Sequence, residues 1–230
     1  MGAFEQTKVF SVTNEKYDEK RPALFLSEMK EIQNNPIERR QILEDLGYDL
    51  FDFDLWKGWL FLEESSAEVL IRDYFIKWCV PQLKYKLRTF SAGSSSKVKS
   101  KFEDFNRLFV FLHLEPTYKN KVWVYIDSGE IEDDIILKMK EKYSASGWSV
   151  EQFGQFSEHD FEKYYPVVFE PEVKRVLSIT DKQQKKKEKA ILLESVKDWI
   201  NENPAEAEIE FKESASEIIK ILKMINKKLS

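Results

Sequence analysis

Cysteine occurs once among the 230 residues, as Cys79. One thiol cannot form an internal disulfide, and alone it cannot build a structural zinc site. No apolar run approaches the roughly 20 residues needed to cross a bilayer, and the segment after Met1 lacks the basic-then-apolar order of a signal peptide. We therefore expect a cytoplasmic protein without a membrane span, stabilised by packing.

Glycine is also scarce, with seven residues, and neither G-x-x-x-x-G-K-[ST] nor G-x-G-x-x-G occurs. This excludes both kinds of phosphate-cradling loop from the chain, so an ATPase that acts with it would have to lie elsewhere. The net charge of −5 argues against nonspecific coating of nucleic acid. A local basic surface remains compatible with that total.

Core material is ample, because 42% of the residues are hydrophobic and six are tryptophan. From Gly58 the sequence alternates between short apolar runs and amphipathic stretches. The predicted strands cover residues 59–62, 85–90 and 122–126, and each is followed by a helical pattern. Such alternation predicts an α/β fold with an open parallel sheet flanked by helices.

The helix after the first predicted strand has clear boundary signals. Ser65 followed by Glu68 is a capping-box signature, and Pro81 ends the pattern. Beyond Tyr143 we expect mostly helix, including 182–201 and 205–228. The apolar stripe from Phe211 to Leu229 could serve a homodimer as readily as the chain's own core.

The sequence patterns divide the chain into three predicted parts. Residues 1–56 are interpreted as an N-terminal appendage, with a strand over 8–13 and a helix that begins near Asn35 and Pro36. Residues 57–170 form the predicted α/β domain, and residues 171–230 form a helical C-terminal extension.

Acidic side chains follow two of the predicted strands. Glu63 and Glu64 end the first, with Glu68 one turn later, and Asp127 and Glu130 follow the third. If these strands are neighbours, their carboxylates converge at one edge of the sheet. Converging carboxylates repel unless a cation neutralises them, and oxygen ligands suit Mg²⁺ or Mn²⁺. The simpler interpretation is that these acids only favour helix N-termini.

The two acidic motifs resemble those of the TOPRIM domain, which topoisomerases, primases and OLD-family nucleases share. Residues 62–68 (LEESSAE) match its strand-end glutamate with a second acid four residues later, although Ser65 stands where glycine is usual. Residues 126–130 (IDSGE) match its Asp-x-Asp motif at Asp127, but Gly129 replaces the second aspartate. The flanking segments resemble the C-terminal part of an OLD-family ATP-dependent endonuclease.

This resemblance implies cleavage of DNA with Mg²⁺ or Mn²⁺, in defence against phage, beside an ABC-type ATPase. Residues 1–56 would then be the linker from that ATPase half. Glu64, Glu68 and Asp127 carry over as catalytic metal ligands, Glu130 as a substitute ligand and Glu162 as a downstream acid. Five lysines are candidate DNA contacts, one of which could support the transition state: Lys97, Lys99, Lys185, Lys186 and Lys189.

Two other functions compete with this one. Gly129 favours a TOPRIM-derived interaction or regulatory module that has lost catalysis and acts with a separate ATPase. A receiver-like domain fits less well, because it needs an acidic pair after its first strand and a lysine after a late one, and the helical tail has no place in it.

Overall fold

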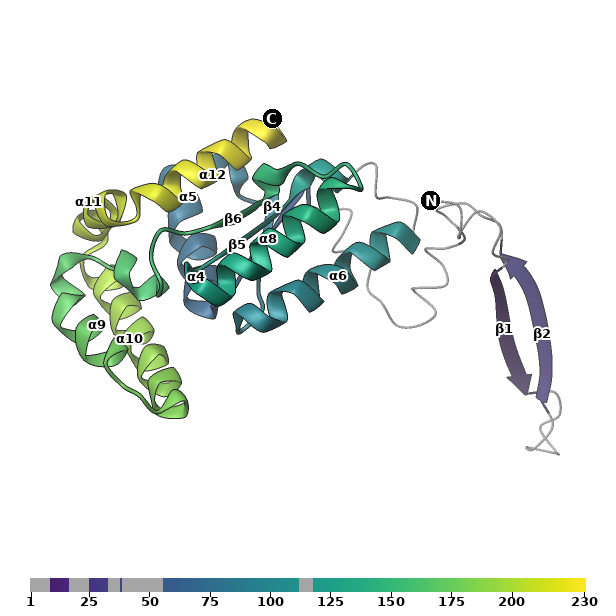
Figure 1. Ribbon diagram of the computed structural model, residues 1–230, viewed down its shortest axis with the longest axis horizontal. Helices are drawn as coiled ribbons and strands as arrows, with labels where there is room; N and C mark the ends of the chain where they lie inside the picture. The colour runs from purple at the N-terminus through teal and green to yellow at the C-terminus, as the bar shows by residue number, and fades with distance from the viewer. Residues whose placement is uncertain (1–8, 17–24, 33–37, 39–55, 112–117) are drawn as a thin grey trace.

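The computed structural model describes residues 9–16, 25–32, 38, 56–111 and 118–230 (Figure 1). Its main sheet has four strands in the order β4-β3-β5-β6, and all neighbouring strands are parallel. The strands are β3 (Gly58–Leu62), β4 (Leu87–Ser91), β5 (Val122–Ile126) and β6 (Phe153–Gln155). The predicted α/β class with a parallel sheet is confirmed. Strand β6 has three residues and lies in the region predicted to be mostly helical.

Both faces of the sheet are covered, which explains the continuous apolar runs. Trp59 and Phe61 of β3 belong to one hydrophobic cluster, together with residues of α6 (Ser95–Phe111) and α8 (Glu130–Ser144). Leu60 and Leu62 point to the other face, where a second cluster forms. Figure 1 shows α6 and α8 side by side over the sheet.

The second face is covered by the helix after β3 and by the C-terminal helix. The first comprises α4 (Ser65–Leu70), a π-helical turn (Ile71–Phe75) and α5 (Ile76–Cys79), and it ends before Pro81 as predicted. The capping box predicted at Ser65 and Glu68 is wrong. Glu64 takes the N-cap position without a side-chain cap, and Glu68 instead accepts a hydrogen bond from the backbone N–H of Ser91.

Four helices follow the sheet: α9 (Glu170–Leu177), α10 (Lys182–Glu202), α11 (Pro204–Ser214) and α12 (Ser216–Leu229). The single helix predicted over 205–228 is wrong, because the chain leaves helical geometry at the buried Ala215. Pro204 begins α11, as its fixed φ favours. The predicted apolar stripe lies in the chain's own core, since Ile218, Leu222 and Ile225 join the cluster of Leu60.

The described part of the N-terminal region is an antiparallel hairpin of β1 (Val9–Lys16) and β2 (Phe25–Ile32). The second of these strands was not predicted. The helix predicted from Asn35 and Pro36 lies outside the described residues, apart from Glu38. Short 3-10 turns cover Pro81–Leu83, Lys119–Lys121, Val150–Gln152, Phe161–Tyr164 and Val167–Phe169. In the described residues, no helix is both long and apolar enough to cross a bilayer.

Candidate metal centre

The site lies where β3 and β5 end. These strands are direct neighbours, with Leu62 opposite Tyr125, so the acids that follow them leave the sheet at the same edge. The charges of Glu63 and Glu64 both act on Asp127. The convergence expected from the two motifs is therefore present for Glu63, Glu64 and Asp127.

A third segment reaches this edge after β6. The backbone N–H of Phe156 donates to the carbonyl of Ile126 at 2.8 Å, and the N–H of Ser128 donates to the carbonyl of Glu158 at 2.9 Å. These bonds hold the chain beside the end of β5. The next residues, Asp160 and Glu162, therefore lie near the acids of the other two strands.

Glu64, Asp160 and Glu162 form one compact group, in which one carboxylate oxygen from each lies within 4.8 Å of the others. Glu162 is fully buried, with 0% of its surface exposed. Burial and the charge of Glu64 raise its pKa. Such a set of oxygen ligands, one buried and two half-buried, could hold a metal ion.

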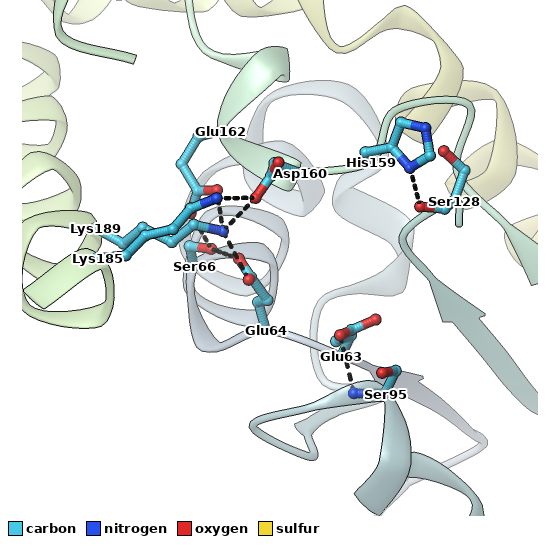
Figure 2. Close-up of polar contacts among 10 residues, drawn as sticks. All are labelled: Glu63, Glu64, Ser66, Ser95, Ser128, His159, Asp160, Glu162, Lys185 and Lys189. Carbon is cyan, nitrogen blue, oxygen red and sulfur yellow. Dashed lines mark hydrogen bonds and ion pairs between the residues drawn. The ribbon is translucent and has the colours of Figure 1, made fainter. Parts of the chain in front are cut away.

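The ammonium of Lys189 lies among these three acids (Figure 2). Its Nζ is 2.8 Å from Glu64, 2.9 Å from Asp160 and 2.7 Å from Glu162. Burial opposes the charge of Lys189, but Glu162 and Glu64 outweigh it and raise its pKa. Lys185, one turn earlier on α10, lies 3.5 Å from Asp160.

Asp160 shows the opposite shift to that of Glu162. Burial alone would raise its pKa, but the hydrogen bond and charge of Lys189 bring it below the ordinary value. The two lysines of α10 thus compensate one half of the acidic cluster and attach the helix to the end of β3.

Glu63 and Asp127 form no ion pair with either lysine in the described residues, although the charge of Lys189 lowers the pKa of Asp127. Oε1 of Glu63 accepts a hydrogen bond of 2.8 Å from the N–H of Ser95, while Oε2 is buried without a hydrogen-bond partner. Burial is the main cause that raises the pKa of Glu63 to about 7. Asp127 is 5% exposed, and burial together with Glu64 and Glu63 raises its pKa to about 9.

Two predicted ligands lie apart from the compact group. Glu68 accepts from the N–H of Ser91 at 3.1 Å and lies 3.4 Å from Arg72, which fixes it between α4 and β4. Glu130 is exposed in the first turn of α8. The structure brings Glu64 and Glu162 together, and the charges of both raise the pKa of Asp127.

The five lysines predicted to contact DNA do not all lie at the acidic site. Lys185 and Lys189 lie at the acids, whereas Lys186 is exposed on the same helix. Lys97 is exposed and Lys99 half-buried on α6. Within the described ranges, neither α6 lysine forms an ion pair with an acid of the site.

Sequence reasoning missed Asp160 and Glu132. Asp160 lies in a segment conspicuous for its charged and aromatic residues, 157–166, which was the available signal. Glu132 is half-buried in the first turn of α8, and its charge contributes to the raised pKa of Glu63. No sequence signal distinguished it from its acidic neighbours.

Comparison with known proteins gives no relative: no family model, no curated protein and no solved structure matches the chain. Chemically, the arrangement joins carboxylates that follow β3, β5 and β6 with a lysine of α10. It can bind a hard cation and present positive charge beside it.

Proposed function

We propose that this protein is a metal-dependent DNA endonuclease of TOPRIM type that uses Mg²⁺ or Mn²⁺. The proposal depends chiefly on one observation: Glu64 and Asp127 leave adjacent parallel strands at one sheet edge, the charge of Glu64 acts on Asp127, and the half-buried Lys189 pairs with Glu64. The motifs at 62–68 and 126–130 support the TOPRIM type, and the OLD family with its role against phage is part of the same proposal, supported by the resemblance of the flanking segments.

The donor atoms fit a hard divalent cation. Glu64, Asp160 and Glu162 offer only oxygen, the charges of Glu64 and Glu162 also act on Asp127, and like charges gathered in this way are costly without a cation. A bound divalent cation supplies Lewis acidity toward a phosphodiester and makes water a stronger nucleophile. Glu64, Asp160 and Glu162 are the residues that would hold it, with Asp127 as a further carboxylate at the same strand edge.

Lys189 and Lys185 supply the second requirement of phosphodiester cleavage. Their side chains project from α10 into the acidic site, so a phosphate that enters there meets positive charge. Because Lys189 bonds to acids in the free protein, we expect it to turn toward a nonbridging phosphate oxygen when DNA binds. Exposed Lys186, and Lys97 and Lys99 of α6, are the proposed contacts to the flanking backbone.

A second function is favoured by one observation. Lys189 already bridges all three acids of the compact group, which is the role that a cation would have there. Together with Gly129 at the second acid position of the motif, this favours an interaction module that acts with a separate ATPase. The two functions differ in whether the isolated chain cuts DNA.

The test is nicking of supercoiled plasmid by the purified chain in Mg²⁺ and in Mn²⁺, with chelator as the blank. We expect cleavage with either metal and none with chelator. Glu64→Gln should reduce the rate by about a hundredfold or more, because it removes a ligand charge.

Glu141→Gln provides the matched control, since Glu141 is exposed on α8, away from the carboxyl ends of the strands. It should cut like the wild type. If the wild-type chain cuts with neither metal, the interaction module becomes the better account. If Glu64→Gln cuts at the wild-type rate, the activity belongs to a contaminant or to another site.

A further inference from the structure

The sheet edge opposite the acidic site carries the reverse charge. Because the four strands are parallel, their first residues meet at this second edge, and the five residues of β3 separate the two edges by about 16 Å. The segments that lead into β3, β4 and β5 cover residues 56–58, 81–88 and 118–122, and they contain no acid. Their basic residues are Lys57, Lys84, Lys86, Arg88, Lys119 and Lys121.

Backbone contacts bring the lysines of these segments together. The N–H of Lys57 donates to the carbonyl of Lys86 at 2.8 Å, which joins the start of β3 to that of β4. On the other side of β3, a Cβ added to Gly58 would lie 3.0 Å from the carbonyl oxygen of Lys121. We call the surface formed by Lys57, Lys84, Lys86 and Lys121 the basic edge. Within the described ranges, none of these four lysines forms an ion pair.

The last turn of α12 adds further positive charge to the basic edge. A Cβ added to Gly58 would lie 2.7 Å from Cδ1 of Leu229, so this turn lies against the start of β3. Lys227 and Lys228 are both exposed there, and Lys228 pairs with Glu151 at 3.4 Å. Cations in the last turn of a helix are favoured by its dipole, so these two lysines alone would indicate no partner.

Tyr85 is the feature of the basic edge that points to a ligand. Its side chain is 74% exposed, and its φ of 62° is the only positive φ outside glycine in the described residues. A left-handed backbone costs free energy in a residue with a Cβ, whereas glycine adopts it freely. The nearby ammonium of Lys84 lies 5.0 Å from the ring centroid. Neither the turn nor the core needs this ring, so its use lies outside the packing of the chain.

A charged edge with an exposed ring matches the way proteins bind single-stranded nucleic acid. Unpaired ammoniums contact the phosphates, and an aromatic side chain stacks on a base. In a duplex the bases stack on one another, so only a single strand offers a base face to Tyr85. An anionic membrane fits less well. In segments 56–58, 81–88 and 118–122, Tyr85 is the only large hydrophobic side chain that is exposed, which leaves little apolar area for insertion.

We propose that the basic edge and Tyr85 form a binding surface for single-stranded nucleic acid, separate from the acidic site. The backbone of the strand follows the lysines across the starts of β4, β3 and β5, and one base stacks on Tyr85. The inference goes beyond the proposed function and does not depend on it, because this binding needs neither a metal ion nor cleavage.

Fluorescence anisotropy of labelled oligothymidylate and oligouridylate tests the surface, with chelator throughout so that no strand is cut. The wild-type chain should bind at least one of them, and the comparison identifies the preferred sugar. Tyr85→Gly should weaken binding by about fivefold or more, because it removes one base stack. Tyr85→Phe keeps the ring and should stay within about twofold of the wild type.

The glycine variant separates recognition from folding. Glycine relieves the left-handed backbone of residue 85, so the thermal midpoint of Tyr85→Gly should equal or exceed that of the wild type while binding is lost. Lys57→Gln and Lys121→Gln should each reduce the salt dependence of log K by about 0.7. Lys138→Gln is the matched control, since Lys138 is exposed on α8 and pairs with Asp134. It should leave the salt dependence unchanged.

Three results would overturn the inference. The wild-type chain binds neither oligonucleotide, Tyr85→Gly binds as tightly as the wild type, or affinity falls in Lys186→Gln but not in Lys57→Gln, which would place the strand at the acidic site. Binding of phosphatidylserine vesicles without binding of either oligonucleotide would assign the surface to a membrane instead. Failure of the proposed function looks different: plasmid stays intact in Mg²⁺ and Mn²⁺, while Tyr85-dependent binding persists.

Discussion

Nζ of Lys189 lies 2.7 Å from Oε2 of Glu162, a carboxylate with no exposed surface. The pair joins α10 to the 3-10 turn after β6, and Glu64 adds the end of β3 to the same ammonium. A buried carboxylate of this kind depends on its partner. If the lysine is removed, the carboxylate stays buried as an uncompensated charge, and the protein is strongly destabilised. The cation of this contact is therefore a structural part of the site.

Replacing Lys189 with methionine should destabilise the protein by about 3 kcal/mol at neutral pH, because the substitution leaves buried acids unpaired. Chemical denaturation with chelator measures the loss. Mn²⁺ should then stabilise this variant more than it stabilises the wild type, because the three acids become free to take a cation.

Lys187→Met is the matched control, since Lys187 is exposed on the same helix. It should leave the free energy of unfolding within about 0.5 kcal/mol of the wild type. Equal stabilities for the two variants would mean that the ion pairs around Lys189 do not hold the acids together.

Asp127 should make stability fall as pH rises. Its pKa is about 9 in the folded protein against an ordinary value of 3.8, so between these values the folded state holds a proton that the unfolded state has lost. Asp127→Asn removes this titration. The variant should match the wild type most closely near pH 4 and exceed its stability at pH 8 by at least about 1.4 kcal/mol, the equivalent of one pKa unit.

Denaturant unfolding at several pH values, with chelator throughout, gives the comparison. Asp198→Asn, at an exposed position of α10, should follow the wild-type pH profile. A constant difference between Asp127→Asn and the wild type at every pH would show that Asp127 does not titrate with the raised pKa.

Tyr164 positions the loop that carries Asp160. Its hydroxyl accepts from the N–H of Ser157 at 3.1 Å and of Glu158 at 3.3 Å, and it donates to Glu217 of α12. Tyr164→Phe should cost about 1 to 2 kcal/mol. It should also speed hydrogen exchange at those two amides, whereas Tyr85→Phe, at an exposed side chain, should change neither quantity. Unchanged exchange would mean that the loop is held without this hydroxyl, by backbone contacts and by Glu217, which also accepts from the N–H of Ser157.

The sequence predicts the central sheet well, because β3 and β5 are apolar runs buried on both faces. It misses β6, since three residues with a glycine in the middle give no periodic signal. The break at Ala215 is also hidden. Neither glycine nor proline marks it, and the apolar spacing of Phe211 and Ile218 continues across the turn.

The same contrast holds at the site. Glu64 and Asp127 are predictable because they follow long strands whose pairing is implied by strand–helix alternation. Asp160 is not predictable from the sequence, since its place depends on the short strand β6. Lys189 stands out only as one of several lysines on α10, and the packing of that helix selects it.

Plasmid nicking by the wild type and by Asp127→Asn at saturating Mn²⁺ tests the central claim most directly, since asparagine keeps the shape of the side chain and removes its charge. The account predicts metal-dependent nicking by the wild type and a rate lower by about a hundredfold or more in the variant. Equal rates for the two proteins, or intact plasmid with both, would contradict it.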